Sequence, residues 1–375
     1  MKIKLLIINS SYILQKLILK LISKLLFRKI NANNIGKILI FRTGSLGDNL
    51  CTLPAINSIR ERYQQQKIHI LYHSGKTPTL SIINIIDNNI IDKFIDYKNI
   101  STKSLIKLLK KEKYSVFVEL PQVHATLWSK IRNIFFAKLI GAKYIAKQVI
   151  FATHIFPQTQ SKYRQFTNVR DVFFDIAKSI GAESRKNVFP LQKTDIDKKI
   201  VTNIISDYNL INKNRNIAIV VGAKRSQNMW GIDNFNNVIT HFSRKNHNLI
   251  LIGGNKESLM VKELLSIPNV FDFTGKLTPI QSGLLMQNCI LTITNDTGPM
   301  HLSYAFGTYT ITIFSSRDYP DLWFPPQNLS YVFRNNSIHC HTCFSETCKN
   351  NICMKEITPE DVINKAEKVI NSNNF

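Results

Sequence analysis

Short apolar runs alternate with amphipathic segments through the first half of the chain. The runs KILIFR (37–42), IHILYH (68–73) and YSVFVEL (114–120) predict strands, and residues 133–146 contain a further short one. A segment with Leu53, Ile56 and Ile59 on one face predicts a helix after the first strand. Residues 168–182 have helical periodicity and end at Gly181, a good C-terminal cap.

A second series of the same kind begins near residue 216. Strands are predicted at 216–222, 248–254, 269–273, 290–295 and 309–314. Helices are predicted at 232–242, at 259–265 and from Thr278 and Pro279 onward. Strand–helix alternation in both halves predicts an α/β protein with two doubly wound, Rossmann-like domains, at 34–195 and 196–356. The polar segment 183–215 contains the boundary, and residues 357–375 form a C-terminal helix.

The first 33 residues form a separate basic arm. Lys16, Lys20, Lys24 and Arg28 recur every four residues among leucines and isoleucines. No apolar run is long enough to span a bilayer, and no small-residue cleavage site follows, which argues against a removed signal peptide. We expect an amphipathic helix on an anionic membrane. The alternative is a helix that docks on the protein's own core with its lysines outward.

The net charge adds a second hint about partners. Of 375 residues, 44% are hydrophobic and 20% charged, which is typical of a globular protein, and the formal net charge is +24. Such an excess of positive charge favours an anionic partner. The alternative, of equal weight, is that a background composition rich in Lys, Asn and Ile accounts for part of the excess. Zinc-finger spacing, RNA-recognition signatures and arginine-rich tracts are all missing from the sequence, so we expect no nucleic-acid partner.

Ligands of open α/β sheets bind beyond the carboxyl ends of the strands, so the loops that follow strands carry the chemistry. We expect two such domains to face each other across a central cleft. The loop Asp296, Thr297 and Gly298 follows a strand and precedes a helix, with Gly298 expected as cap and Pro299 as first helical residue. Such a helix N-terminus binds phosphates, and His301 could reach the same anion. An ordinary capped helix is the alternative.

Two further loops of the second half carry suitable groups. Lys224 and Arg225 follow the strand at 216–222 and could supply cations to a phosphate, or lie in solvent as most such pairs do. Glu257 follows Gly253 and Gly254, where a carboxylate could bind ribose hydroxyls or serve only as the start of a helix.

The loop TGSLGDNL (43–50) is the counterpart in the first half. It has neither the G-x-G-x-x-G spacing of a dinucleotide site nor a Walker lysine, so an NAD-dependent oxidoreductase is disfavoured. An aspartate is a poor phosphate ligand but a suitable general base for a hydroxyl nucleophile. Asp48 is therefore either a base, presented by Gly44, Ser45 and Gly47, or only a helix cap.

These stretches together resemble glycosyltransferase family 9, the lipopolysaccharide heptosyltransferases. The resemblance covers residues 37 to about 370 and depends on the pairing of LGD early with NDTGPMHL late. It implies the GT-B fold and an inverting transfer without metal or other cofactor. It also implies a nucleotide-sugar donor, typically ADP-heptose, in the C-terminal domain and the lipopolysaccharide inner core as acceptor in the N-terminal domain.

Individual roles follow from the same resemblance. The catalytic base maps onto Asp48, the diphosphate loop onto residues 296–298 with His301, and the nucleoside carboxylate onto Glu257. Members usually carry a lysine two residues before the tryptophan of NMWG, whereas this chain has Asn228, so Lys224 or Arg225 would have to compensate. Apart from that resemblance, the acceptor-binding candidates are Gly44, Ser45 and Gly47 of the Asp48 loop and three basic residues of the first half, Lys130, Arg132 and Arg170. For each of the basic residues, plain solvent exposure is the alternative.

Four cysteines crowd into HCHTCFSETCKNNICM. Cys340, Cys343, Cys348 and Cys353 are spaced Cys-x2-Cys-x4-Cys-x4-Cys, which could hold a structural zinc ion. The spacing is irregular for a zinc ribbon, so free or redox-active thiols are the alternative. Cys51 and Cys289 stand in apolar segments and are expected to be buried.

The sequence thus predicts a glycosyltransferase peripheral to the cytoplasmic leaflet of the inner membrane. One alternative is a transferase for a different nucleotide sugar, which Asn228 suggests. The other is a non-catalytic, sugar-nucleotide-binding regulator of core assembly, against which the intact Asp48 and Asp-Thr-Gly loop argue.

Overall fold

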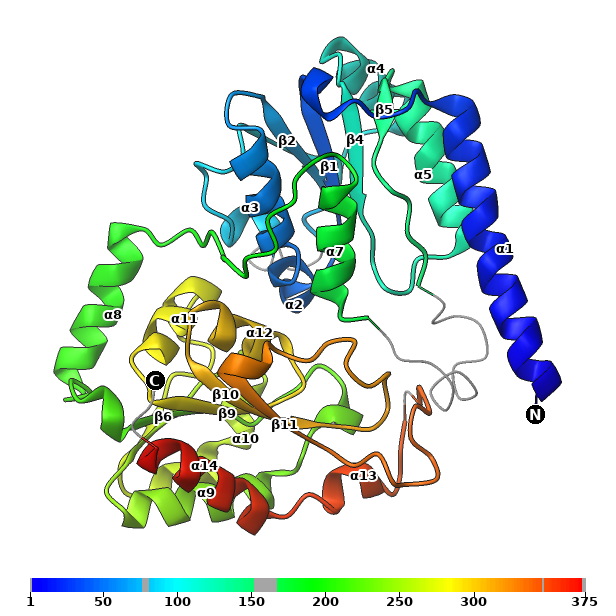
Figure 1. Cartoon of the computed structure of the whole chain (residues 1–375). Coiled ribbons are helices and arrows are strands. Elements are labelled where there is room, and N and C mark those ends of the chain that lie inside the picture. The colour runs from blue at the N-terminus through cyan, green and yellow to red at the C-terminus, as the bar shows by residue number, and fades with distance from the viewer. Residues whose placement is uncertain (1, 76–80, 152–166, 346, 373–375) are drawn as a thin grey trace. The chain divides into compact units, whose positions relative to one another are not determined.

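The chain divides into two compact units, residues 1–192 and 193–375 (Figure 1). The structure is a computed structural model and describes residues 2–75, 81–151, 167–345 and 347–372, with the side chains described from residue 10 onward. Each unit contains one parallel β-sheet with helices on both faces. The predicted α/β class with two doubly wound, Rossmann-like domains is therefore confirmed.

Unit 1 has a five-stranded sheet in the order β3-β2-β1-β4-β5. Its central strand β1 pairs in parallel with β2 and β4, and the order reverses between β1 and β4. The strands are β1 (Ile38–Arg42), β2 (Ile68–Tyr72), β3 (Lys93–Asp96), β4 (Val116–Leu120) and β5 (Tyr144–Ile145). The helices are α1 (Lys2–Leu26), α2 (Leu46–Leu50), α3 (Leu53–Arg62), α4 (Thr102–Lys111), α5 (Leu127–Leu139) and α7 (Val169–Lys178).

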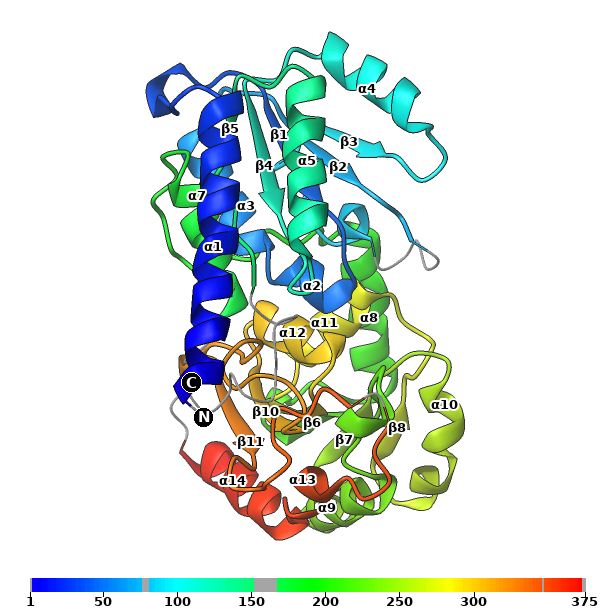
Figure 2. The same cartoon turned by 90° about the vertical axis from the view of Figure 1, so that its right-hand side faces the viewer.

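Helices cover the two faces of this sheet in separate groups. Figure 2 shows α1 and α5 side by side on one face, where they share a core with Leu39 of β1 and Phe117 of β4. On the other face, α3 packs against α7. Strands β2 and β4 are buried along their whole length, as expected for the interior of a parallel sheet covered on both sides.

Unit 2 has a six-stranded parallel sheet in the order β11-β10-β9-β6-β7-β8, with the reversal between β6 and β9. The strands are β6 (Asn216–Val220), β7 (Asn248–Leu251), β8 (Val270–Asp272), β9 (Leu291–Asn295), β10 (Tyr309–Phe314) and β11 (Ser330–Arg334). The helices are α8 (Asp195–Asp207), α9 (Ile232–Arg244), α10 (Glu257–Met260), α11 (Pro279–Gln287), α12 (Gly298–Ala305), α13 (Ile352–Lys355) and α14 (Pro359–Asn371). This is the strand order of the Rossmann fold.

Two segments differ from the sequence prediction. The polar stretch near the boundary contains helix α8, which begins with a capping box between Thr194 and Asp197. The helix expected at 259–265 is instead one α-helical turn, α10, followed by a 3₁₀ helix at Lys262–Ser266. The predicted start of α11 is confirmed, because Thr278 is its N-cap and Pro279 its first residue.

Helix α1 packs on unit 1 rather than extending from it. Leu19 is 1% exposed within the core that α1 shares with α5, and Lys138 Nζ donates to the Leu26 carbonyl oxygen at 2.8 Å. Beyond the helix, the Arg28 amide donates to the Lys143 carbonyl. Within the described residues, the helices all fall short of the length or the apolarity that crossing a membrane requires.

Candidate active site

The loops after β6 and β9 meet at the point where the strand order of unit 2 reverses. Asn295, the last residue of β9, joins them through its side chain: Nδ2 donates to the Val221 carbonyl at 2.8 Å, and Oδ1 accepts from the Trp230 amide at 3.1 Å. Ligands of doubly wound sheets bind at such a reversal. The candidate diphosphate loop and the NMWG loop are therefore brought together, as a shared binding site requires.

Helix α12 begins one residue earlier than predicted. Thr297 is the N-cap, with φ −155° and ψ 171°, so Gly298 is the first helical residue and Pro299 the second. The cause is backbone geometry, since the extended conformation of Thr297 is the one that N-cap residues adopt. Its hydroxyl makes no capping hydrogen bond to the helix. The N-terminal amide of Gly298 and this hydroxyl therefore lie at the same helix end, where an anion is favoured.

Asn228 is a structural partner of Asp296. Its Nδ2 donates to the Asp296 carbonyl at 3.2 Å and to Oδ2 at 3.1 Å, and its Oδ1 accepts from Ser315 Oγ at 2.7 Å. The side chain is buried, so it links the loops after β6, β9 and β10. A neutral amide thus occupies the position where the family resemblance leads one to expect a cation.

Asp296 retains its proton more strongly than an ordinary aspartate. Burial raises its pKa to about 7, and the negative charge of Asp318 acts in the same direction. Arg225, Arg317 and Arg334 oppose the rise without cancelling it. Arg225 therefore acts electrostatically on the loop, whereas Lys224, two residues after Gly222, is exposed at the surface of the same segment.

Glu257 lies beside the loop after β6. Its Oε2 accepts from the Gly254 amide at 2.8 Å, and its side chain covers Gly222. A Cβ at Gly222 would stand 2.3 Å from Glu257 Cγ, so only glycine permits this approach. Glu257 Oε1 is thereby placed near the β6 loop, where a polyhydroxyl group could bind.

His301 and Trp230 are interior residues. His301 is 5% exposed, and its Nδ1 forms a 2.7 Å hydrogen bond with Tyr304 Oη. Trp230 is buried in the unit 2 core, and its Nε1 donates to the Ile357 carbonyl at 2.8 Å. Trp230 therefore anchors the β6 loop to the core of unit 2 instead of facing a ligand.

In unit 1, Asp48 lies at the reversal between β1 and β4. Ser45 is the N-cap of α2, and Asp48 is the third helical residue. The Asp48 Oδ2 atom accepts from the Ser45 amide at 2.9 Å and from Ser45 Oγ at 2.6 Å. The capping role is thus present, while Oδ1 makes no hydrogen bond within the described part of the chain. A cap and a base are compatible on the two oxygens of one carboxylate.

Gly44 is required by close packing. A Cβ at this position would lie 2.6 Å from Asp48 Cβ and 3.0 Å from Arg42 Nη2. Arg42 is fully buried: Nη1 donates to the carbonyls of Leu120 and Pro121 after β4, and Nε donates to Asn49 Oδ1. Burial lowers the pKa of Arg42, and the Asp48 carboxylate partly offsets that. The loop after β1 is therefore fixed to the loop after β4.

The three basic acceptor candidates have different environments. The structure does not support Lys130 as an acceptor ligand. Lys130 is 0% exposed, and its Nζ lies 2.6 Å from Glu119 Oε2, so its ammonium does not reach the surface. Arg132 is exposed on α5. Arg170 is buried at the start of α7, one turn before Phe173, whose ring lies 5.4 Å from Arg42 Cζ. Arg170 is thus the candidate on the same helix as Phe173, which packs against Arg42.

Sequence reasoning missed two polar residues that assemble these loops, Arg42 and Asn295. Each ends a strand at a sheet reversal and is buried. A polar residue at the end of an otherwise apolar central strand is the signal that could have revealed them.

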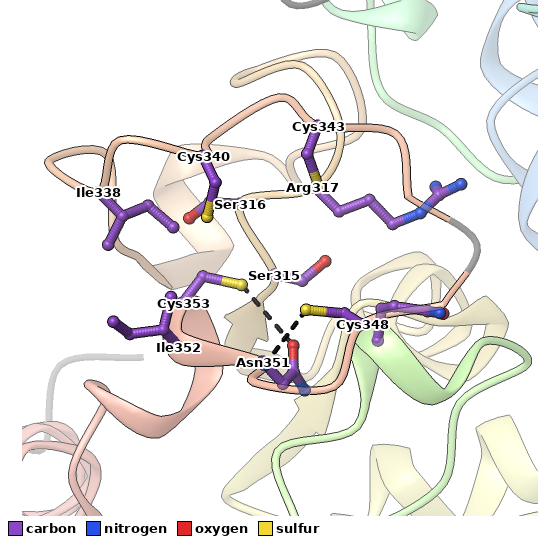
Figure 3. A pocket seen from close by; sticks show the side chains of 11 residues that line it. Ser315, Ser316, Arg317, Ile338, Cys340, Cys343, Cys348, Asn351, Ile352 and Cys353 are labelled. Carbon is purple, nitrogen blue, oxygen red and sulfur yellow. Dashed lines mark hydrogen bonds between the residues drawn. The ribbon is translucent and has the colours of Figure 1, made fainter.

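The four clustered cysteines line one cavity in unit 2 (Figure 3). The cavity has a volume of about 310 Å³, including space open to solvent, and is also lined by Gln227, Ser315 and Arg317. All four are free thiols, and the Asn351 amide donates to Cys348 Sγ at 3.2 Å. Two of these lining residues are neighbours of Asn228: Gln227 precedes it in the chain, and Ser315 donates a hydrogen bond to its side chain. The cavity therefore adjoins the candidate donor loops.

The thiols are not arranged as a metal centre. Across the described residues, no group of three or more His, Cys, Asp or Glu side chains is placed to hold a metal ion. Burial raises the pKa of Cys353, and the other three cysteines add to the rise. Cys51 and Cys289 are both buried, as their apolar sequence context predicted.

Several known proteins are similar over nearly the whole chain. Lipooligosaccharide heptosyltransferase 2 of Campylobacter jejuni is 26% identical over 349 residues, which are 90% of this chain and all of that protein. A family 9 glycosyltransferase of Veillonella parvula superposes with a TM-score of 0.70 at 18% identity, covering 92% of this chain and 100% of that one. The ADP-heptose lipopolysaccharide heptosyltransferase II of E. coli gives 0.63 at 16% identity, covering 90% and 100%.

One of the similar proteins contains iron. The iron-containing dodecameric glycosyltransferase TibC of enterotoxigenic E. coli superposes with a TM-score of 0.56 at 14% identity, covering 92% of this chain and 78% of that one. At this identity the likeness concerns the fold alone. The family whose sequence pattern matches residues 154–353 is glycosyltransferase family 9 (heptosyltransferase). Because that match covers more than half of the 375 residues, the chain belongs to glycosyltransferase family 9 and is an enzyme of the heptosyltransferase type.

Proposed function

We propose that this enzyme moves a heptose from ADP-heptose to the inner core of lipopolysaccharide. Its similarity to a protein named ADP-heptose lipopolysaccharide heptosyltransferase II supports the choice of donor and acceptor. The single structural observation that carries the proposal is the Asp-Thr-Gly loop at the N-terminus of α12, joined to the β6 loop at the strand reversal of unit 2.

The donor binds unit 2 in this proposal. The Gly298 amide and the Thr297 hydroxyl bind the diphosphate, and Lys224 and Arg225 supply positive charge. They stabilise the nucleoside diphosphate as it departs and its negative charge grows. Glu257 binds the ribose hydroxyls. Asn228 and His301 hold the loops in shape, because Asn228 donates to Asp296 and His301 is hydrogen-bonded to Tyr304.

Asp48 of unit 1 is the general base. It removes a proton from the acceptor hydroxyl, whose oxygen attacks the anomeric carbon from the face opposite the departing ADP, so that the configuration inverts. The Ser45 hydrogen bonds hold Oδ2 and leave Oδ1 for this proton. Gly44 and Gly47 allow the loop to present Asp48, and Arg170 contributes charge toward the acceptor.

Substituting Asp48 by Asn separates the base from the cap. An asparagine can still accept hydrogen bonds from Ser45 but cannot take a proton at neutral pH. We expect Asp48→Asn to keep the melting temperature and lose transfer by about a hundredfold or more, as general-base loss typically does. Near-full transfer by this variant would show that Asp48 is only a cap.

Donor identity can be read from ligand-induced stabilisation. A donor that binds the folded state raises the melting temperature with concentration. We expect ADP-heptose to do so more than GDP- or UDP-sugars. A larger shift with another nucleotide would make this a transferase for a different donor, in keeping with Asn228 in place of the lysine. Binding without transfer to any heptose-deficient core would favour the non-catalytic regulator.

The transfer needs no metal in this proposal, and the enzyme acts at the cytoplasmic face of the inner membrane. Full activity after treatment with EDTA, together with an inverted anomeric configuration of the product by NMR, is the expected outcome. Loss of activity that a divalent metal restores would overturn metal independence alone. The basic helix α1 supports the membrane location.

A further inference from the structure

We propose that helices α1 and α5 of unit 1 together form one membrane-binding face for an anionic bilayer. The inference rests on the proposed membrane location of the enzyme and adds the surface that makes the contact. The sequence singled out only α1. The structure adds α5, which contributes the most exposed aromatic side chain of the described residues, Trp128.

Helix α1 has two different apolar faces. Leu19, Ile22 and Leu26 pack into the core that α1 shares with α5. Leu17, Leu21 and Leu25 recur at helical spacing on another side and are 55%, 59% and 75% exposed. A helix that only docks on its own protein needs the first face and not the second. The second is therefore left for another apolar phase.

Helix α5 repeats this arrangement. Ile134 and Ala137 are buried in the shared core, whereas Trp128, Phe135 and Leu139 are exposed. The exposed residues follow one another at seven and four positions, which places them on a single face. Trp128 is 77% exposed, and aromatic rings of this kind favour the interfacial region of a bilayer.

The two exposed faces are turned the same way. The helices lie side by side on one face of the sheet (Figure 2), and the contact of Lys138 with Leu26 and Phe27 aligns their C-terminal ends. Since both bury their inner sides in one core, both outer sides point away from the same sheet. Their exposed apolar side chains thus belong to one surface of unit 1.

Charge identifies the partner as an anionic lipid surface. Neither α1 nor α5 contains an aspartate or glutamate. Exposed cations accompany the apolar residues: Lys16, Lys20, Lys24 and Arg28 on or just after α1, and Arg132 and Lys138 on α5. Basic residues beside an inserted apolar face bind anionic headgroups. Arg132 lies on the exposed face of α5 itself, which gives this acceptor candidate a lipid phosphate as its partner.

Vesicle binding by the full chain, without donor or acceptor, tests the proposal. We expect binding to vesicles of phosphatidylcholine with roughly 30% phosphatidylglycerol, weak binding to phosphatidylcholine alone, and weakening as NaCl rises from about 0.1 M to about 0.5 M. The variants Leu17→Gln/Leu21→Gln/Leu25→Gln and Trp128→Gln/Phe135→Gln should each lower partitioning by about tenfold. Glutamine is a good helix former, so the helices should persist.

A matched control comes from unit 2. Ile196, Ile211 and Leu259 are 73%, 72% and 69% exposed, and their triple change to Gln should leave binding unaltered. Lipids with brominated acyl chains should quench tryptophan emission in the parent and not in Trp128→Phe. Equal vesicle binding by the parent and both face variants overturns the proposal. A dimer that light scattering detects in the parent and not in the face variants also overturns it, because a second copy of the chain would then cover the exposed face of α1 and α5.

The outcome is separable from that of the proposed function. Transfer to a core oligosaccharide freed of its lipid should be unchanged in both face variants. If the parent binds vesicles but transfers nothing, the proposed reaction fails and the membrane face stands. If the parent transfers sugar but does not bind vesicles, the membrane face fails and the proposed reaction stands.

Discussion

The buried Lys130–Glu119 pair gives the sharpest test of how unit 1 is held together. Both side chains are out of solvent, at 0% and 4% exposure, and their charged atoms lie 2.6 Å apart. Burial lowers the pKa of Lys130, and Glu119 opposes that. Asn133 Nδ2 donates to the other carboxylate oxygen at 2.9 Å. The pair joins β4 to α5, so its loss acts on the core of unit 1.

Lys130→Met leaves the Glu119 carboxylate buried without its cation. Removing one partner of a buried pair costs about 3–5 kcal/mol of unfolding free energy. Because Glu119 can take up a proton instead, the charge penalty at pH 7 is limited to roughly 2.7 pH units at about 1.36 kcal/mol each, or about 3.7 kcal/mol. For a unit of this size we expect the melting temperature to fall by about 6–15 °C.

The pH dependence supplies a second signature. A glutamate whose folded pKa is raised contributes stability below its unfolded pKa and loses it as the pH rises. The difference between Lys130→Met and the parent should therefore shrink toward about 1 kcal/mol near pH 5. The change Glu119→Gln in the Lys130→Met background removes the unpaired charge and keeps the Asn133 partner, so it should recover most of the loss at pH 7.

Scanning calorimetry of the full chain measures these shifts. Lys107→Met, at an exposed position on α4, is the matched control and should change stability by less than about 0.5 kcal/mol. A melting temperature of Lys130→Met within a degree or so of the parent at pH 7 would contradict this prediction. Such a result would mean that Lys130 is solvated, and it would return this residue to the acceptor candidates.

Three further predictions concern the two loops and the thiols. Gly44→Ala should lower transfer strongly and leave the folding of unit 2 almost unchanged, because the new Cβ would lie 2.6 Å from Asp48 Cβ and displace Asp48. Unchanged activity in the transfer assay would show that the loop can move aside at little cost in free energy. Folding raises the pKa of Asp296 to about 7, so the stability that its protonated form contributes below about pH 4 is lost as the pH rises to about 7. The melting temperature of the parent should therefore fall relative to that of Asp296→Asn between about pH 4 and pH 7, and a constant difference would contradict this. A thiol reagent should modify Cys51 and Cys289 only after unfolding, because both are buried, and reaction of either thiol in the folded protein would contradict this. Metal analysis of protein purified without chelator should find less than one equivalent, and a full equivalent would contradict the arrangement of the thiols described above.

Local pattern was enough for most of the architecture. Central strands of a parallel sheet are buried on both faces, so runs such as 37–42 and 290–295 are rich in β-branched and other apolar residues and are recognised from the sequence alone. Caps with their own chemistry were equally readable, as Thr278 and Pro279 at the start of α11 show. By contrast, β3 and β11 are edge strands with partly exposed positions, and their pattern is too mixed to stand out.

Local pattern along the chain sufficed for the α/β class, for the presence of a second sheet of the same kind and for the loops that carry the candidate chemistry, because these depend on residues close together in the chain. The partner of each buried polar side chain, by contrast, emerges only when the chain has folded. Nothing near Lys130 in sequence reveals its contact with Glu119, and nothing near Asn228 reveals its contact with Asp296. The first contact joins helix α5 to strand β4, and the second joins the loops after β6 and β9. For α1, the repeat of leucines predicted an amphipathic helix, but only its packing against α5 separated the leucines that face the core from those left exposed.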